Sequence, residues 1–206
     1  MIKKIFKYIL LSLFIFLGAN NTYAITANEV LTNASEKYQK EGSISAQFTL
    51  SGVGNSTDGT IIIAGDKFHL STPLLSIWYN GRTQWTYSAE TNEVNITEPT
   101  VEELQQVNPF AIINSFRKQF DATLLKSANN KYRIQLTPLK SVNTSISKAI
   151  VTLNVATLYP TEIALTIDNN IITININNIK TIKTIHHKTF VFDEKKYPNA
   201  EIIDLR

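Results

Sequence analysis

The chain contains no cysteine, and this absence excludes three kinds of chemistry. An exported domain without cysteine has no disulfide framework, so its hydrophobic core must hold it together. It also has no thiol nucleophile and no thiolate ligand for a metal. Because no cysteine is present to carry a lipid either, we expect the processed protein to be soluble.

Long hydrophobic runs are scarce as well, and the one that stands out lies close to the N-terminus. Residues 9–17 are apolar almost throughout, yet this run is too short to span a bilayer comfortably. Lys3, Lys4 and Lys7 precede it, and small or polar residues ending at Ala24 follow it. This order is typical of a secretory signal peptide that is cleaved after Ala24. A retained anchor helix is the alternative.

An excess of one charge is also absent once that segment is removed. The full chain has 20 Lys and Arg against 17 Asp and Glu, and losing the three lysines of residues 1–24 leaves 17 against 17. A neutral protein lacks the basic surface that nucleic acid requires, so we expect no nucleic-acid partner. Seven glycines and six prolines argue against a long disordered linker. We therefore predict a signal peptide, residues 1–24, and one exported domain, residues 25–206.

Most of the exported domain alternates between apolar and polar residues, which predicts β-strands. The clearest runs are residues 43–51 and 171–177. Asn80-Gly81 predicts a tight hairpin, because both residue types accept a positive φ. The alternating runs from residue 43 onwards, the last of them at Phe190 and Phe192, predict ten to eleven strands. The connections between them are short enough for antiparallel pairing. The apolar face of these strands must be buried in an interior. A closed barrel and an open half-barrel both provide one.

Two segments have helical periodicity instead. Residues 27–40 place apolar residues at helical spacing and stop at Gly42. Residues 100–116 begin with a capping-box pattern, Thr100 and Glu103, and Pro109 interrupts them. A helical insert in a protein made of strands suggests a flap over an apolar cavity. The apolar stripe of this insert is formed by Leu104, Phe110, Ile113 and Phe116.

The apolar faces of the strands are the strongest signal in the chain. They offer a large set of candidate cavity residues, although such residues equally well fill an ordinary core. The set comprises Phe48, Phe68, Leu70, Trp85, Tyr87, Val94, Ile96, Ile172 and Ile174, the last two on a face that extends to Ile176.

Histidine is rare, which limits the chemistry on offer. His69 stands between Phe68 and Leu70, and on a regular strand its side chain points away from theirs. A Ser-His-Asp set assembled from distant segments is possible in principle, but no local motif supports one. We therefore predict no catalytic residue, no metal site and no cofactor.

Two stretches each carry charge of one sign. Glutamates gather between residues 90 and 103, and lysines gather between residues 180 and 196, at Lys180, Lys183, Lys188, Lys195 and Lys196. Both stretches can be ordinary solvated faces. The alternative is a docking surface, where charge steers the encounter with a partner.

Several short motifs, taken in order, carry a resemblance to a known family. They are Gln47-Phe48, Gly59-Thr60-Ile61, Lys67-Phe68-His69-Leu70, Pro73, Trp78-Tyr79-Asn80-Gly81, Trp85-Thr86-Tyr87 and Asn108-Pro109-Phe110, with the C-terminal residues 197–206. With these motifs in this order and spacing, the chain resembles a divergent branch of the LolA family of periplasmic outer-membrane lipoprotein carriers.

The resemblance implies a fold and a function. The fold is mainly β with a helical lid: an open antiparallel half-barrel of about eleven strands over a hydrophobic cavity. The acyl chains of lipidated proteins lie in that cavity, and the helices close it. The carrier is a monomer in the periplasm that takes cargo from an inner-membrane release complex and passes it to an outer-membrane acceptor.

One position departs from the family pattern. The family typically has an arginine after the Phe of the third strand, where it holds the lid shut, and this chain has His69. A neutral histidine donates only one hydrogen bond, so His69 is a candidate for a weaker lid latch. Three other functions stay open: a lipid-binding or envelope-stress sensor on the same fold, an exported hydrolase, and a structural β domain with a filled interior.

Overall fold

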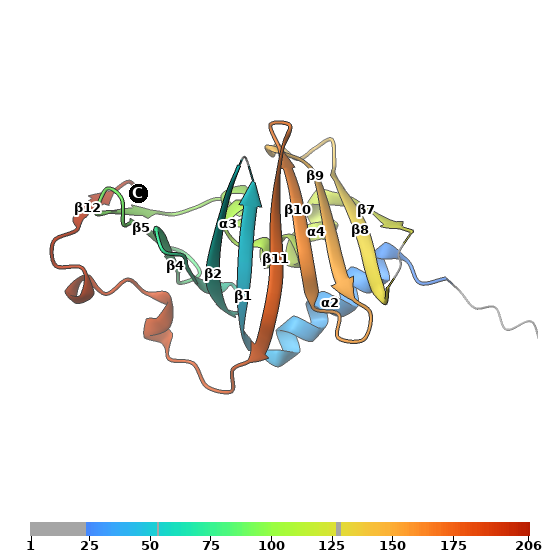
Figure 1. The fold of residues 1–206 in the computed structure, drawn as a ribbon, viewed down its shortest axis with the longest axis horizontal. Helices are drawn as coiled ribbons and strands as arrows, with labels where there is room; N and C mark the ends of the chain where they lie inside the picture. The colour runs from blue at the N-terminus through green and yellow to red at the C-terminus, as the bar shows by residue number, and fades with distance from the viewer. Residues whose placement is uncertain (1–23, 53, 127–128) are drawn as a thin grey trace, which may run out of the picture.

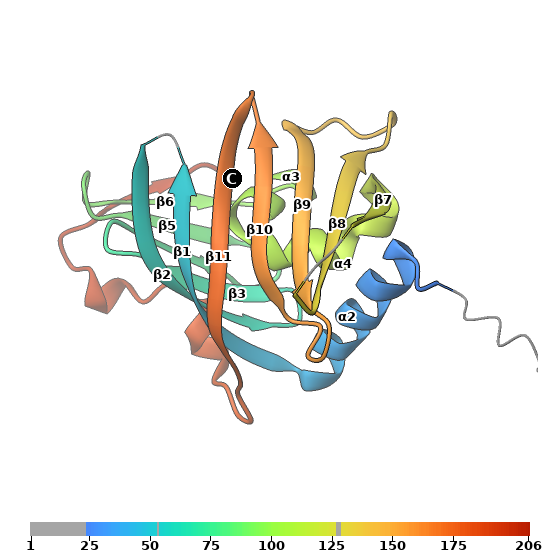
Figure 2. The same ribbon diagram turned by 45° about the vertical axis from the view of Figure 1, so that its right-hand side comes forward.

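The computed structural model describes residues 24–52, 54–126 and 129–206, so the predicted signal peptide lies outside the described residues except for Ala24. In these ranges twelve strands form one sheet in the order β12-β6-β5-β4-β3-β2-β1-β11-β10-β9-β8-β7 (Figures 1 and 2). The strands are β1 (Ser43–Gly52), β2 (Asn55–Ala64), β3 (Lys67–Ser71), β4 (Leu75–Tyr79), β5 (Gln84–Ser88), β6 (Glu93–Thr97), β7 (Phe120–Leu125), β8 (Lys131–Pro138), β9 (Ile146–Asn154), β10 (Pro160–Ile167), β11 (Asn170–Thr181) and β12 (Glu201–Asp204).

The sheet is open, which decides between the two architectures that the sequence allowed. Its edges are β12 and β7, which do not pair with each other, so the barrel is not closed. The prediction of an open, mainly antiparallel sheet with helices is confirmed, with one strand more than the expected eleven. The extra strand, β12, was not predicted, and it pairs in parallel with β6.

The predicted hairpin at Asn80-Gly81 joins β4 to β5. The Asn80 side chain accepts hydrogen bonds from the backbone N–H groups of Arg82 at 3.0 Å and of Thr83 at 2.9 Å. Gly81 has φ of 100°, a conformation that favours glycine, whereas Asn80 itself does not adopt a positive φ. The turn therefore has four residues, 80–83, and this length sets the register of β5 against β4.

The first described helix, α2 (Ala27–Glu41), is confirmed with a cap at each end. Thr26 donates its backbone N–H to the Glu29 carboxylate at 2.7 Å, and its hydroxyl accepts from the Glu29 backbone at 3.2 Å. Gly42 ends the helix with φ of 77°. No other residue type would take that conformation without strain.

The helical insert consists of two helices, α3 (Val101–Val107) and α4 (Pro109–Gln119). Thr100 and Glu103 form the predicted capping box, since Thr100 donates to the Glu103 carboxylate at 2.7 Å. Asn108 separates the helices, and its side chain accepts from the Phe110 backbone N–H at 3.1 Å. Proline at the first position of α4 explains the break, because it has no backbone N–H to continue the hydrogen bonding of α3.

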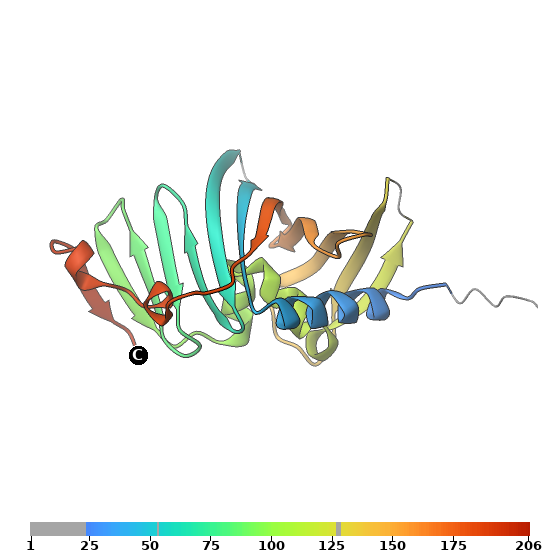
Figure 3. The same cartoon turned by 90° about the horizontal axis from the view of Figure 1, so that it is seen from below.

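All three helices lie on the same side of the curved sheet, which we call the inner face (Figure 3). In α4, Ile112 and Ile113 are fully buried and Phe116 is 2% exposed, in one cluster with inner-face residues such as Phe48 and Ile61. The core of the protein therefore lies between the inner face and α2 and α4. None of the helices within the described ranges is long and apolar enough to cross a membrane.

The other side of the sheet, the outer face, is covered in part by the C-terminal segment. After β11 the chain forms two short 3-10 helices, η1 (His187–Phe190) and η2 (Glu194–Lys196). The prediction of a strand through Phe190 and Phe192 is therefore wrong. Phe192 instead packs against Trp78 of β4 with ring centroids 5.4 Å apart. Two aromatic residues at a spacing of two look like a strand, but here they anchor an irregular segment to the sheet.

Candidate functional site

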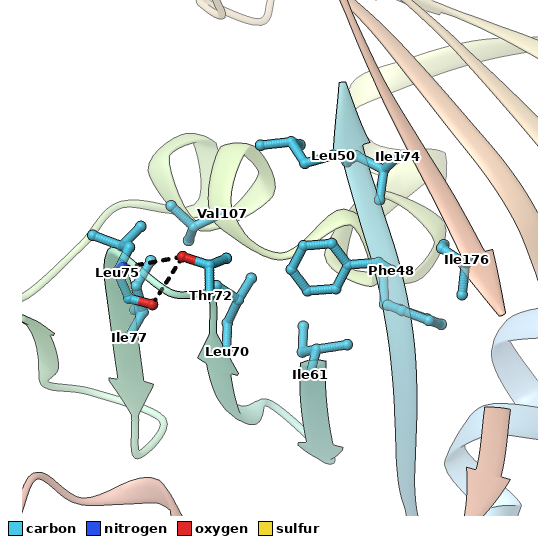
Figure 4. Close-up of a pocket in the computed structure, with 11 residues that line it drawn as sticks. Phe48, Leu50, Ile61, Leu70, Thr72, Leu75, Ile77, Val107, Ile174 and Ile176 are labelled. Atoms are coloured by element: carbon cyan, nitrogen blue, oxygen red, sulfur yellow. Dashed lines mark hydrogen bonds between the residues drawn. The ribbon is translucent and has the colours of Figure 1, made fainter. Parts of the chain in front are cut away.

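An apolar cavity of about 130 Å³ lies on the inner face, and we call it the inner cavity (Figure 4). Strands β1 to β4 and β11 form its floor and walls, and the junction between α3 and α4 forms its roof. Its lining residues are Phe48, Leu50, Ile61, Leu70, Thr72, Leu75, Ile77, Val107, Phe110, Ile174 and Ile176.

Thr72 is the one polar residue of this lining, and its hydroxyl is already satisfied. It donates to the Leu75 carbonyl at 3.2 Å and accepts from the Leu75 backbone N–H at 3.0 Å. No charged residue lines the cavity. An engineered cavity of about 150 Å³ with such a lining stays dry and binds small apolar molecules, so this one suits an apolar ligand.

The shape of the floor depends on a glycine. A Cβ atom on Gly59 of β2 would lie 2.3 Å from the Phe48 ring, far inside contact distance. The Phe48 ring can therefore lie across the β2 backbone only because Gly59 has no side chain. The ring ends one side of the cavity, so Gly59 controls how much space remains beneath α3.

Helix α3 is seated loosely on the sheet. A second hollow of about 440 Å³, the side pocket, is lined by Val101 and Leu104 of α3 together with Phe68 and Tyr79. Val101 is 52% exposed, and Leu104 and Val107 are only partly buried. Helix α3 thus borders unfilled space on two sides, and Leu104 and Val107 are its partly buried contacts with the core.

Polar contacts attach α3 to α4 rather than to the sheet. Buried Gln105 donates its amide to the Ser115 hydroxyl at 2.6 Å and to the Gln119 side chain. Gln119 in turn donates to the Glu102 carboxylate at 3.2 Å. Among the described residues, the side-chain amide oxygen of Gln105 has no hydrogen-bond partner although it is buried, which costs free energy.

In contrast, α4 is fixed to α2. Asn114 accepts a hydrogen bond from Ser35 at 3.1 Å. Phe110 meets the Tyr38 ring edge-on with centroids 6.2 Å apart. The Tyr38 hydroxyl donates to the Leu158 carbonyl at 2.5 Å, and burial raises the pKa of Tyr38 above its ordinary value. Helix α4 is therefore part of the core, whereas the apolar residues of α3 are only partly buried.

Part of the predicted cavity set comes together as expected. Phe48, Leu70 and Ile174 line the inner cavity, and so does Phe110 of the predicted lid. Ile172 lies on the same face of β11 as Ile174, half-buried and outside this lining.

The remaining predicted lid and cavity residues of the inner side lie elsewhere. Phe68 and Leu104 line the side pocket instead. Ile113 and Phe116 are buried in the core beneath α4 and do not line the cavity. Only the first part of the predicted lid therefore has the exposure that a movable element needs.

The prediction is wrong for four other cavity residues, which lie on the outer face: Trp85, Tyr87, Val94 and Ile96. Pairing places Trp85 opposite Trp78, and Tyr87 opposite Val94. Ile96 pairs with Trp85 and so shares its face. Trp78 alternates along β4 with Ile77, which lines the inner cavity, so all these side chains point away from it. Trp85, Tyr87 and Val94 pack in one cluster with Phe192 and Tyr197 of the C-terminal segment.

The candidate latch His69 is also on the outer face. Its ring stacks on Trp78 with centroids 5.0 Å apart and an angle of 14° between the planes. Burial, and to a lesser degree the nearby Lys196 ammonium, lowers the pKa of His69 below its ordinary value. A side chain on this face cannot reach α3, so the latch assignment is wrong. The side-chain hydrogen bond from Gln105 to Ser115 joins α3 to α4.

Six lining residues were missed: Leu50, Ile61, Thr72, Leu75, Ile77 and Val107. Leu50 continues the alternation that contains Phe48, so the pattern was available. Ile77 pairs with Leu70, which only the strand register reveals. No group of three or more acidic or histidine side chains that could hold a metal ion occurs in the part of the chain that the structure describes.

Sequence and structure comparisons agree with this architecture. The family model described as outer membrane lipoprotein carrier protein LolA matches residues 17–168. A crystal structure of an uncharacterized conserved protein from Thermus thermophilus is similar with a TM-score of 0.61 and 9% identity, covering 86% of this chain and 98% of that one.

Two further structures are similar at a lower level. A LolA superfamily protein from Nitrosomonas europaea gives a TM-score of 0.46 and 12% identity, covering 82% of this chain and 99% of that one. A DUF1329 family protein from Desulfovibrio piger gives a TM-score of 0.47 and 10% identity, covering 80% of this chain and 96% of that one. No curated protein matches the chain in sequence.

Proposed function

The chain belongs to the LolA family of outer membrane lipoprotein carrier proteins, and from that premise we propose that it carries lipidated proteins across the periplasm. It binds the acyl chains of its cargo in the inner cavity, as a monomer and without a cofactor or an enzymatic step. An inner-membrane release complex supplies the cargo and an outer-membrane acceptor takes it. The observation that carries the proposal is the uncharged apolar cavity beneath a half-buried helix.

The size of the cavity indicates a closed state. Sites for drug-sized ligands have volumes of about 300–1,000 Å³, and the inner cavity has about 130 Å³. A whole acyl chain therefore needs more room than the closed protein offers. Movement of α3 away from the sheet would join the inner cavity to the side pocket, because α3 lies between them.

Competition between α3 and the acyl chain explains how cargo can be released. Each methylene transferred from water to an apolar site gains about 0.8 kcal/mol, so a fixed, fully open cavity would hold an acyl anchor too tightly. When Leu104 and Val107 must leave the apolar face to admit the chain, part of that gain is lost. Binding is then moderate, and transfer to a stronger acceptor runs downhill without ATP.

Two substitutions to glutamate test where the cargo binds. Val107→Glu places a carboxylate at the inner cavity, and Ile171→Glu places one at a 59% exposed position of β11 that lines neither the inner cavity nor the side pocket. We expect Val107→Glu to weaken binding of an acylated lipoprotein at least about tenfold, because a charge in an apolar site is costly. Ile171→Glu should change it little. Equal binding by wild type and both variants, with unchanged circular dichroism, would place the cargo elsewhere.

A sensor on the same fold also needs an apolar cavity, so binding alone does not separate it from a carrier. Transfer does. Purified protein loaded with a palmitate-labelled lipoprotein is mixed with outer-membrane vesicles, and the label is followed after the vesicles are sedimented. A carrier loses the label to the vesicles, whereas a sensor retains it.

A further inference from the structure

A third hollow, the outer groove, lies on the outer face between β3 and β4 and the C-terminal residues 188–197. Its volume is about 730 Å³, within the range of about 300–1,000 Å³ that is usual for small-ligand sites. Trp78, Phe192 and Tyr197 form its apolar wall, with ring centroids 5.2 to 5.8 Å apart. These mutual contacts give the groove a defined wall without filling it.

The groove is rich in positive charge. Lys188, Lys195 and Lys196 line it, and Asp193 is the one carboxylate among its lining residues. The Asp193 side chain accepts the backbone N–H of Lys195 at 3.3 Å. None of the salt bridges found in the described ranges involves these lysines. Since the chain beyond residue 24 has 17 charges of each sign, this excess is local to the groove.

Uncharged hydrogen-bond donors line the same groove. They are the imidazole of His69 and the hydroxyls of Ser71, Ser76 and Thr189. Burial, and to a lesser degree the Lys196 ammonium, lowers the pKa of His69, so its imidazole is neutral near pH 7 and offers one N–H. Ammonium groups, hydroxyls and an imidazole N–H thus surround one space.

We propose that the outer groove binds an anionic phosphate-bearing group, carried either by a lipid headgroup or by a small soluble molecule. Phosphate oxygens accept strong hydrogen bonds from ammonium and hydroxyl groups. An extended acidic peptide fits less well, because β3 and β4 are interior strands that are paired on both sides and offer no free edge. The site is separate from the inner cavity, so it does not depend on the proposed carrier function.

The groove and the inner cavity share one hairpin. Ser71 and Ser76 line the groove, with hydroxyl oxygens 3.3 Å apart, and Thr72 and Leu75 between them line the cavity. A ligand in the groove therefore binds to the same turn that forms the cavity wall.

Titration with glycerol 3-phosphate, followed by NMR of backbone amides, tests the site directly. We expect shifts at Ser71, Ser76 and Thr189. The triple variant Lys188→Gln/Lys195→Gln/Lys196→Gln should weaken binding at least about tenfold, because each lysine contributes to attraction of the anion. The matched control is Lys126→Gln/Lys131→Gln/Lys148→Gln, which removes three exposed lysines from the opposite end of the sheet and should leave binding unchanged.

Vesicle flotation then identifies the source of the phosphate. Binding to phosphatidylglycerol vesicles, lost in the groove variant and kept in the control variant, indicates a lipid headgroup. Binding of glycerol 3-phosphate without vesicle binding indicates a soluble ligand, and both results support the site. Failure to bind either probe, equal loss in both triple variants, or tighter binding of hexaglutamate than of glycerol 3-phosphate would overturn it.

Discussion

The two faces of the β3–β4 hairpin are covered in different ways. The inner face meets α3, a short helix with Val101 largely exposed and hollow space on two sides. The outer face meets the C-terminal segment, whose Phe192 and Tyr197 pack directly on Trp78. One cover is loose over an uncharged cavity, and the other is anchored by aromatic rings beside a charged groove. The same two strands therefore carry a loosely packed cover on one face and a firmly packed cover on the other.

Removing the ring at the centre of the outer cover should have the largest effect. Trp78→Ala deletes a side chain that is 7% exposed and contacts Phe192, Tyr197 and His69. We expect a loss of about 3–5 kcal/mol in the free energy of unfolding, measured by urea denaturation. Binding of an apolar probe to the inner cavity should persist in the folded fraction. Loss of less than about 1 kcal/mol would mean that the outer cover is as loose as the inner one.

A smaller effect is expected from Gly59→Ala on the inner side. The added methyl group would lie 2.3 Å from the Phe48 ring, so the ring must move into the cavity. Overpacking of this kind costs about 1–3 kcal/mol, and an apolar probe should bind more weakly. Gly52→Ala is the matched control, since its closest contact would be 3.2 Å, to a backbone oxygen of Ile171. Equal effects of the two variants on probe binding would show that Gly59 does not control the shape of the cavity.

Loosening the inner cover alone should change kinetics more than stability. Thr100→Ala removes the cap of α3, and Thr26→Ala removes the same capping box from α2. Each should cost about 1 kcal/mol. Only Thr100→Ala should speed hydrogen exchange in α3 and the uptake of an apolar probe, because α2 does not line the cavity. Faster uptake in both variants would show that the helices open as one unit.

The smallest effect concerns pH. Because the pKa of His69 is lowered in the folded protein, the unfolded chain binds the proton more readily. His69 therefore supports stability above its ordinary pKa of about 6.5, and that contribution fades as the pH falls towards the lower folded-state value. Urea denaturation between pH 8 and pH 5 should show a smaller loss of stability for His69→Gln than for wild type. Binding to the inner cavity should not follow this titration, since His69 lies on the other face.

The sequence predicted the elements of the fold better than the faces of its strands. The capping box at Thr100, the break at Pro109 and the alternation around Phe48 were predicted from local rules, and the structure has all of them. In β5, Trp85 and Tyr87 alternate with polar residues, so they were expected to face a core. They do, but that core is the aromatic cluster beneath the C-terminal segment. The alternation of apolar and polar residues assigns side chains to the two faces of a strand. It does not show which segment of the chain packs on each face.

The cavity itself required contacts between distant segments. Gly59 and Phe48 meet only because β1 and β2 pair in one register, and Val107 reaches the cavity because the chain turns at Asn108. Spacing along the chain contains neither fact. The family resemblance supplied the idea of a cavity, whereas the strand register supplied its residues.

Methyl NMR of the isoleucine-labelled protein with an acylated peptide tests the central claim most directly. Isoleucines lie on both faces, at Ile61, Ile77 and Ile174 around the inner cavity and at Ile96 on the outer face. An acyl chain beneath α3 should shift the methyl signals of the first three and leave that of Ile96 unchanged. Shifts centred on Ile96, or none at Ile61, Ile77 and Ile174 while the peptide is bound, would contradict binding in the inner cavity.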